Sequence, residues 1–306
     1  MVDLSIKIKN VEFSNPVLVA SGTFGYGNEV NELVDVNRLG GIVTKSITLH
    51  PREGNPPPRM VETPSGLLNS IGLANIGVER YISEMLPYYE ELDTNVIMNI
   101  AGSSLQEYIT ILERVEGTSN YLSGYEINIS CPNVEKGGLE FGVDCDLTLA
   151  LTKELRKRTD KLLIMKLSPN VTDIASIAKA AELGGVDAIS AINTVVGMSI
   201  NPQTRKQNIF TGLSGLSGPA IRPVGVANVY KIFDAVDIPI IGIGGITSAD
   251  DVVEYLLAGA TAVQVGTANF RDPGIGIQII KQLFEYCEEH NVPSIRELVG
   301  AIRDED

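Results

Sequence analysis

The sequence predicts an α/β fold, a (β/α)₈ TIM barrel, and three observations support this prediction. Eight short runs of apolar, largely β-branched residues recur along the 306-residue chain. Amphipathic segments of helical period separate most of these runs. The runs are almost continuously apolar, which is typical of parallel strands buried on both faces. A doubly wound sheet is the alternative, but eight rather evenly spaced units favour a closed barrel.

The predicted elements follow one another in the order that a barrel requires. The alternating residues at the N-terminus are expected to form a short β-hairpin ahead of the barrel. The eight predicted strands are Val17–Ala20, Gly41–Thr44, Asn95–Asn99, Tyr125–Ile129, Leu162–Leu167, Ala188–Ile192, Ile240–Ile243 and Ala262–Val265. The predicted helices are Val78–Leu92, Leu105–Val115, Leu147–Arg158, Thr172–Leu183, Arg222–Phe233 and Ser248–Ala258, with a final helical pattern around Cys287. Suitable N-cap residues stand at three of these helix starts: Ser104, Asp144 or Asp146, and Ser248.

Length and composition indicate one domain that spans residues 1–306. With 44% hydrophobic residues, the chain is large enough for an α/β barrel, which runs to about 250 residues or more. The formal net charge of −14 and the lack of a Lys/Arg cluster argue against a nucleic-acid partner. The uncharged stretch from Ala188 to Thr204 contains Asn, Ser, Gly and Pro, so we expect no membrane span there.

The cysteines indicate a reducing compartment. Cys131, Cys145 and Cys287 are odd in number, widely spaced and without a C-x-x-C pair. Such a set forms neither a disulfide framework nor a zinc or iron–sulfur site, so we expect no metal on this chain. No signal peptide precedes the first strand-like residues, and we therefore expect a cytoplasmic location.

Polar residues and glycines stand at the carboxyl ends of the predicted strands. In chain order they are Ser21-Gly22, Lys45-Ser46, Asn99, Asn128 through Cys131, Lys166, Asn193-Thr194, Gly244-Gly245 and Gly266-Thr267. This face hosts the active site in barrels of this kind. A lysine in an apolar strand is costly to bury without a partner, so Lys166 indicates either a structural salt bridge or a site for an anionic ligand. A second lysine at the same rim, Lys45, favours the ligand site.

Cys131 is the candidate catalytic base. It follows the fourth predicted strand, lies between Asn128 and Asn133, and precedes a proline that restricts the turn. A buried structural cysteine is the alternative, since free cysteines are mostly small buried hydrophobes. The chain has only two histidines, however, and a thiol near lysine side chains can serve as a base near neutral pH.

The glycine pairs after the last two strands predict a phosphate site. Glycine allows backbone N–H groups to approach a phosphate closely, and the loops after strands 7 and 8 often form a phosphate site in barrels. Gly244-Gly245 is followed by a predicted helix start at Ser248, whose positive dipole end adds to this site. No G-x-G-x-x-G opens a helix after a strand, so the sequence carries no dinucleotide fingerprint.

Three connections are longer than simple links. They follow strands 2, 4 and 6, and they run from Ser46 to Gly77, from Cys131 to Val143 and from Asn193 to Ile221. We expect these long insertions at the carboxyl-end face of the barrel. Ordered insertions of this kind tend to be lids or binding loops, and disorder is the alternative.

Several motifs together resemble the dihydroorotate dehydrogenases, and they keep that family's order over nearly the whole chain. The motifs are Asn128-Ile-Ser-Cys-Pro-Asn133, Asn69-Ser-Ile-Gly-Leu73, Lys45-Ser46, Lys166, Asn193-Thr194 and Gly244-Gly245. The NAD-linked type 1B branch is indicated by Arg52-Glu-Gly-Asn55, Glu62-Thr63, Asn193-Thr-Val-Val-Gly-Met198 and Gly212-Leu-Ser-Gly-Leu-Ser-Gly-Pro-Ala220. The fumarate-linked soluble type shares the cysteine and is the nearest alternative. The quinone-linked type differs by a membrane extension and a serine base.

The resemblance implies one FMN per chain and oxidation of (S)-dihydroorotate to orotate in pyrimidine (UMP) biosynthesis. The implied FMN contacts are Ser21, Lys45, Ser46, Asn99, Asn128, Lys166, Ile192, Gly218, Gly244, Gly245, Gly266 and Thr267. The implied substrate contacts are Lys45, Asn69, Ser70, Ile71, Gly72, Leu73, Asn128, Asn133, Asn193 and Thr194. Cys131 would remove the C5 proton while a hydride passes from C6 to N5 of FMN. Lys166 would lie near the N1 side of the ring, where a cation stabilises the reduced flavin.

The resemblance also implies a partner subunit that holds FAD and a [2Fe–2S] cluster and passes electrons to NAD⁺. The expected assembly is a homodimer of this chain within a heterotetramer. Three alternatives stay open. The first is a transfer-RNA dihydrouridine synthase, which the acidic charge balance disfavours. The second is a pyrimidine-reducing domain related to dihydropyrimidine dehydrogenase, which is a neighbouring family. The third is a non-catalytic scaffold barrel, which would be expected to have lost Cys131, Lys45 or Lys166.

Overall fold

The computed structural model describes residues 2–118, 120–130, 132–133 and 139–302. Eight parallel strands close into a barrel, hydrogen-bonded in the order β3-β4-β7-β8-β11-β12-β17-β18 and back to β3. They are β3 Val17–Val19, β4 Gly41–Val43, β7 Asn95–Ala101, β8 Gly124–Asn128, β11 Leu162–Leu167, β12 Ala188–Ala191, β17 Ile240–Ile243 and β18 Ala262–Val265. The predicted barrel and all eight predicted strands are confirmed, and their ends differ by a residue or two at most.

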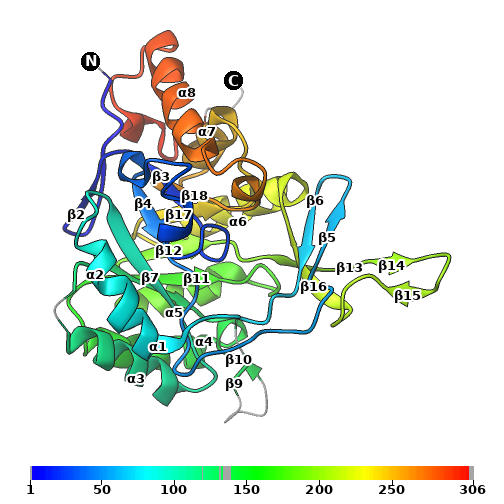
Figure 1. Ribbon diagram of the computed structural model, residues 1–306. Coiled ribbons are helices and arrows are strands. Elements are labelled where there is room, and N and C mark those ends of the chain that lie inside the picture. Colours follow the sequence, from blue (N-terminus) through cyan, green and yellow to red (C-terminus); the bar gives the residue numbers. More distant parts are fainter. Residues whose placement is uncertain (1, 119, 131, 134–138, 303–306) are drawn as a thin grey trace.

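Helices cover the outside of the barrel between most of its strands (Figure 1). They are α3 Leu105–Glu116, α4 Cys145–Arg156, α5 Ile174–Gly184, α6 Arg222–Phe233, α7 Ala249–Leu257 and α8 Ile275–Glu289. The predicted N-caps of three helices are confirmed. The side chains of Ser104, Asp144 and Ser248 accept hydrogen bonds from backbone N–H groups in the first turn of α3, α4 and α7.

The helix predicted over Val78–Leu92 is interrupted. It consists of α1 (Gly77–Arg80), a π-helical turn η3 (Tyr81–Met85) and α2 (Leu86–Tyr89). Pro87 has no N–H group to donate back along the chain, so regular α-helical bonding cannot continue through this point. The sequence pattern correctly indicated helical periodicity here but not the change of helix type.

Short helical turns occupy several other connections. The described chain between β3 and β4 contains two such turns and no α-helix, so the first connection departs from the ideal barrel pattern. The 3₁₀ turns are η1 Asn28–Val30, η2 Val36–Arg38, η5 Phe141–Val143, η6 Pro219–Ile221, η7 Thr267–Phe270 and η8 Ile295–Leu298.

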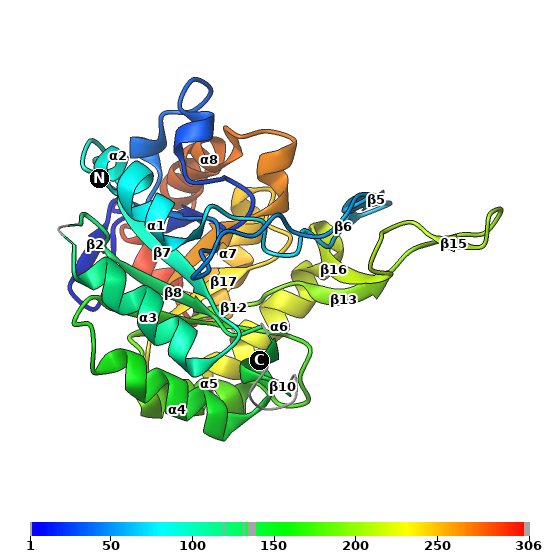
Figure 2. The same ribbon diagram turned by 60° about the horizontal axis from the view of Figure 1, so that its bottom comes forward.

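An arm projects from the carboxyl-end face of the barrel (Figures 1 and 2). We define the arm as residues 60–69 and 195–217. Its base is an antiparallel sheet in the order β13-β16-β6-β5, and its tip is the hairpin β14–β15. Its strands are β5 Met60–Thr63, β6 Gly66–Asn69, β13 Val195–Met198, β14 Ile200–Asn201, β15 Lys206–Gln207 and β16 Leu213–Ser217. The insertions after the second and sixth barrel strands therefore pair with each other.

Two further hairpins flank the barrel. The predicted N-terminal hairpin is confirmed, with β1 (Ile6–Ile8) antiparallel to β2 (Val11–Phe13). The insertion after the fourth barrel strand contains β9 (Pro132–Asn133), which pairs with β10 (Leu139–Glu140). Cys131 comes immediately before β9 in the sequence and lies outside the described residues.

Strand β8 shows how the barrel interior becomes polar. Tyr125 and Ile127 are fully buried in the main apolar core. The alternate residues Glu126 and Asn128 point to the opposite face of the strand, because side chains alternate along a strand. All five residues of β8 are buried, so its polar groups lie inside the protein rather than in solvent. None of the helices in the described ranges is long and apolar enough to cross a membrane.

Candidate active site

A cavity of about 650 Å³ opens at the carboxyl ends of the barrel strands and is bordered by the arm. Almost all of the predicted site residues line it, although they come from distant parts of the chain. The predicted FMN contacts that line it are Ser21, Lys45, Ser46, Asn128, Lys166, Ile192, Gly218, Gly244, Gly245, Gly266 and Thr267. The predicted substrate contacts that line it are Lys45, Asn69, Ser70, Ile71, Gly72, Leu73, Asn128, Asn193 and Thr194.

The structure does not place three predicted residues on the cavity wall. Asn99 is fully buried below the cavity, where its amide contacts Glu126. Cys131 lies outside the described residues. For Asn133 only the backbone pairing with Leu139 is described. The roles of these three residues stay predictions.

Several lining residues were not among the predicted FMN or substrate contacts. They are Ala20, Gly22, Thr23, Met60, Ala74, Ser130, Ser217, Ile221, Ile243 and Phe270. Half of them stand next to a predicted contact, so extending each motif by one position would have found Ala20, Gly22, Ala74, Ser217 and Ile243. Met60 and Phe270 give no such signal, because they reach the cavity through the arm and through η7.

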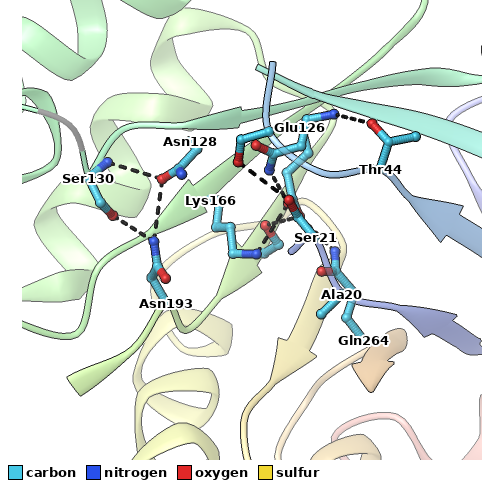
Figure 3. Close-up of polar contacts among 12 residues, drawn as sticks. Ala20, Ser21, Thr44, Glu126, Asn128, Ser130, Lys166, Asn193 and Gln264 are labelled. Carbon is cyan, nitrogen blue, oxygen red and sulfur yellow. Dashed lines mark hydrogen bonds and ion pairs between the residues drawn. The ribbon is translucent and has the colours of Figure 1, made fainter. Parts of the chain in front are cut away.

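The floor of the cavity is a hydrogen-bonded cluster that we call the floor network, made of Asn99, Glu126, Lys166, Ser190 and Gln264. Glu126 is fully buried and lies at its centre (Figure 3). Its Oε1 accepts a hydrogen bond from Asn99 Nδ2 at 2.7 Å and lies 3.3 Å from Lys166 Nζ. Its Oε2 accepts from Ser190 Oγ at 2.8 Å and from Gln264 Nε2 at 2.6 Å. The four donors match the roughly four lone-pair positions of a carboxylate.

A buried carboxylate requires a cation and hydrogen-bond donors to offset its lost hydration. Lys166 supplies the cation for Glu126, and it also borders the cavity from β11. The salt bridge that the sequence left open for Lys166 is therefore present. The same side chain nevertheless remains next to any ligand in the cavity.

The rim of the cavity, which we define as Lys45, residues 69–74, Asn128, Ser130, Asn193 and Thr194, is made of loops and strand ends. Asn193 Nδ2 donates to Asn128 Oδ1 at 3.3 Å and to Ser130 Oγ at 2.9 Å (Figure 3). These contacts orient both amide side chains. Within the described ranges, the Asn128 amide nitrogen itself donates no hydrogen bond, so it is available to a ligand.

Lys45 differs from Lys166 in its surroundings. Its backbone N–H donates to Gly25 O at 2.9 Å, which holds the loop after β4. Its ammonium, by contrast, makes no hydrogen bond or ion pair with any residue that the structure describes. An unpaired ammonium on the wall of a cavity is suited to an anionic group of a ligand.

The glycine loop after β17 forms another wall. Gly244 and Gly245 have φ values of +128° and +70°, which side chains disfavour. A Cβ atom on Gly245 would also lie 2.8 Å from Gly218 O and 2.8 Å from Arg222 Cβ. The N–H groups of Gly245 and Gly266 donate to no other described residue. Free N–H groups suit a phosphate, and Gly245 lies shortly before the start of α7. The phosphate site stays a prediction.

Tyr255 of α7 supports this loop. Its hydroxyl donates to Ile243 O at 3.2 Å and to Gly244 O at 2.8 Å. Burial raises the pKa of the Tyr255 phenol, so the hydroxyl keeps its proton and remains a donor at neutral pH. The hydrogen bonds therefore persist under the conditions in which an enzyme would work.

The two described cysteines do not line the cavity. Cys287 is buried in α8 and belongs to the main apolar core. Cys145 is exposed at the start of α4, and partial burial together with Asp144 and Asp146 raises the pKa of its thiol. In the part of the chain that the structure describes, no group of three or more His, Cys, Asp or Glu side chains could hold a metal ion.

A second hollow, of about 610 Å³, lies at the opposite end of the barrel, around the N-terminal hairpin and the loop before β11. Its Lys157 and Arg158 are ion-paired with Glu154. None of the predicted site residues borders it. The cavity at the carboxyl ends is therefore the candidate site, and its lysines, amides and free N–H groups suit planar, polar ligands that carry negative charge.

Comparisons with known proteins indicate one family. The family model for dihydroorotate dehydrogenase matches residues 3–286. The chain is 45% identical over 302 residues to "Dihydroorotate dehydrogenase B (NAD(+)), catalytic subunit" of Bacteroides thetaiotaomicron, with 99% of each chain covered. It is 49% identical over 300 residues to the protein of the same name from Desulforamulus reducens, with 98% of each covered. The crystal structure of the Eimeria tenella enzyme DHODH in complex with ferulenol shares the fold, with a TM-score of 0.80 at 20% identity over 98% of this chain and 88% of that one.

Proposed function

The chain belongs to the dihydroorotate dehydrogenase family, and we propose that it oxidises (S)-dihydroorotate to orotate in pyrimidine (UMP) biosynthesis. Similarity over almost the full length to NAD-linked catalytic subunits supports the type 1B branch. The structural observation that carries the proposal is the convergence of Lys45, Lys166, the rim amides and the glycine loops on one cavity.

The residues of the cavity fit FMN as the cofactor. The N–H groups of Gly245 and Gly266 fit its phosphate, because both residues line the cavity and donate to no other described residue. The wall also has no room for a side chain at Gly245, so the backbone itself is exposed to a ligand. Lys166 fits the N1 side of the ring, where a cation is favourable. When bound, FMN supplies the acceptor for the hydride that leaves C6 of the substrate.

The rim would hold dihydroorotate. The unpaired Lys45 ammonium suits the substrate carboxylate, and the oriented amides of Asn128 and Asn193 suit its ring amide groups. Cys131 would take the proton from C5, so the proton and the hydride leave from neighbouring carbons and a double bond forms between them. No other cysteine lies in the motifs Asn69–Leu73, Asn128–Asn133 and Asn193-Thr194, which supply most of the predicted substrate contacts.

We further propose that electrons leave this chain through a separate subunit that carries FAD and a [2Fe–2S] cluster and reduces NAD⁺. The chain has three cysteines without cluster spacing and lacks a dinucleotide fingerprint, which supports a second protein. The relatives are named as catalytic subunits, which also supports an assembly of several chains. We propose a homodimer within a heterotetramer, in the cytoplasm.

Purification of the chain tests the function. It should carry a flavin that absorbs at about 450 nm, and it should form orotate from dihydroorotate with an artificial electron acceptor. A colourless chain that FMN does not reconstitute would contradict the proposal. Addition of a co-purifying iron–sulfur flavoprotein should allow NAD⁺ reduction, whereas direct fumarate reduction without any partner would place the chain in the fumarate-linked type.

A further inference from the structure

We propose that Glu126 is a positioning residue for the flavin reaction: it fixes the Lys166 ammonium at the cavity floor and offsets its charge, and it thereby sets the reduction potential of FMN in the cavity. This proposal rests on the proposed function, because it concerns the same FMN site. Glu126 does not line the cavity and therefore acts through Lys166.

The geometry of Glu126 is that of a fixed anchor. Its neutral donors come from three strands: Asn99 on β7, Ser190 on β12 and Gln264 on β18. Strand β18 is four strands away from β8 in either direction around the barrel, so the bond from Gln264 to Glu126 spans the barrel interior. A carboxylate held from several directions has one position, and it imposes that position on the ammonium that it binds.

Lys166 is the link between this anchor and the cavity. Its residue is 6% exposed, and the small exposed part lies on the cavity wall. In the barrel register it stands beside Asn128 on β8 and beside Ser190 on β12. Among the described residues, Glu126 is its single ion-pair partner. Lys166 therefore reaches the cavity wall while its ammonium is held by Glu126.

The charges of the floor network sum to zero, with one carboxylate and one ammonium. Removing the carboxylate would leave a net positive charge below the flavin, which favours the electron-rich reduced ring and raises its potential. Removing the ammonium would leave a net negative charge, with the opposite effect. At the separations within one site, one unpaired charge is expected to change the ratio of affinities for reduced and oxidised FMN roughly tenfold or more.

The test is a set of four variants with the two-electron reduction potential of bound FMN as the readout. Glu126→Gln should raise the potential by about 30 mV or more, since tenfold corresponds to that value for a two-electron couple. Lys166→Met should lower it by a similar amount and weaken FMN binding. The double variant Glu126→Gln/Lys166→Met should lie closer to the wild type than either single variant. Ser190→Ala, which removes one hydrogen bond to Glu126 without changing charge, is the matched control and should shift the potential much less.

Thermal unfolding of the flavin-free protein provides a second readout that does not need FMN. Lys166→Met leaves Glu126 charged and buried, so it should lower Tm, and adding Glu126→Gln should restore part of the loss. If Glu126→Gln fails to fold, the proposal is tested by comparing the FMN potential and the Tm of Lys166→Met with those of the double variant. A normal potential in Glu126→Gln, or a double variant no closer to wild type than Lys166→Met, would overturn this proposal alone. A wild-type chain that binds no flavin would instead overturn the proposed function, and this proposal with it.

Discussion

In the floor network every donor around Glu126 comes from a barrel strand and contacts the Glu126 carboxylate. In the rim, by contrast, the Lys45 ammonium and the Asn128 amide nitrogen have no hydrogen-bond partner among the described residues. The floor is fully or almost fully buried, and the rim borders the cavity. Floor groups contribute to stability and to the local charge, while rim groups are kept for ligands. Changes at the floor should thus affect folding and the reduction potential of FMN, and changes at the rim should affect substrate binding and turnover.

The largest effect is expected at Cys131, the predicted general base. Cys131→Ala should keep FMN and bind orotate but lower kcat about 10²–10⁴-fold, because it removes the general base. Steady-state turnover of dihydroorotate measures this. Cys145→Ala is the control: its thiol lies outside the cavity, and because its pKa is raised it stays protonated at neutral pH. Near-normal turnover of Cys131→Ala would remove Cys131 from the mechanism.

The next largest effect is expected at the floor. Glu126→Leu leaves the Lys166 ammonium buried without its carboxylate, so the free energy of unfolding should fall by about 3–5 kcal/mol. Urea unfolding of the flavin-free protein measures this loss. An unchanged unfolding midpoint would mean that the floor network does not stabilise the barrel.

Lys45→Met, at the rim, should affect substrate binding and not stability, which is the opposite of Glu126→Leu. The free energy of unfolding should be unchanged, because the ammonium has no partner in the described part of the chain. Loss of a hydrogen bond to a charged group should raise KM for dihydroorotate about ten- to a hundredfold. Kinetics and urea unfolding of the same preparation separate the two effects. If Lys45→Met lost as much stability as Glu126→Leu, the contrast between rim and floor would be lost.

Gly245→Ala tests the phosphate loop. The positive φ and the close approach of Gly218 O should make the variant strained by about 1–3 kcal/mol. We expect weaker FMN binding, measured by titration of the flavin-free protein with FMN fluorescence. Gly274→Ala is the control, since its φ is −81° and it does not border the cavity. Equal FMN affinity in both variants would contradict a phosphate site at this loop.

The smallest effect is expected for Tyr255→Phe. The variant loses the hydroxyl that bonds Ile243 O and Gly244 O, which should cost about 0.5–1.5 kcal/mol of stability. FMN affinity should fall only slightly, because the glycine backbone itself remains. A loss of FMN affinity as large as that of Gly245→Ala would show that Tyr255 controls the loop conformation more than its two hydrogen bonds suggest.

The barrel was predictable because each of its strands can be recognised from a short stretch of sequence. Each one is a short apolar run, and the polar ends of the runs lie on one face by the rule of parallel barrels. The arm was not predictable, since β6 pairs with β16 across about 150 residues of sequence, as in the contact of Ser217 with Leu67. Nothing local to either segment specifies that pairing.

Most rim residues were likewise predictable from motifs, whereas three of the five floor residues, Glu126, Ser190 and Gln264, were missed. Asn99 and Gln264 contact Glu126 from 27 and 138 residues away, and Gln264 stands inside an apolar strand. One signal was available: Glu126 is two residues before Asn128 and therefore points to the same face of β8. Combined with the need of a buried Lys166 for a partner, this spacing could have identified the carboxylate.

Anaerobic mixing of the flavin-bound chain with dihydroorotate, with no partner subunit present, tests whether this chain alone transfers a hydride from dihydroorotate to its flavin. The flavin absorbance at about 450 nm should disappear as one orotate forms per flavin, because we propose that this chain alone supplies the groups that bind, orient and deprotonate the substrate. A bound flavin that keeps its absorbance in the presence of excess dihydroorotate would contradict the account.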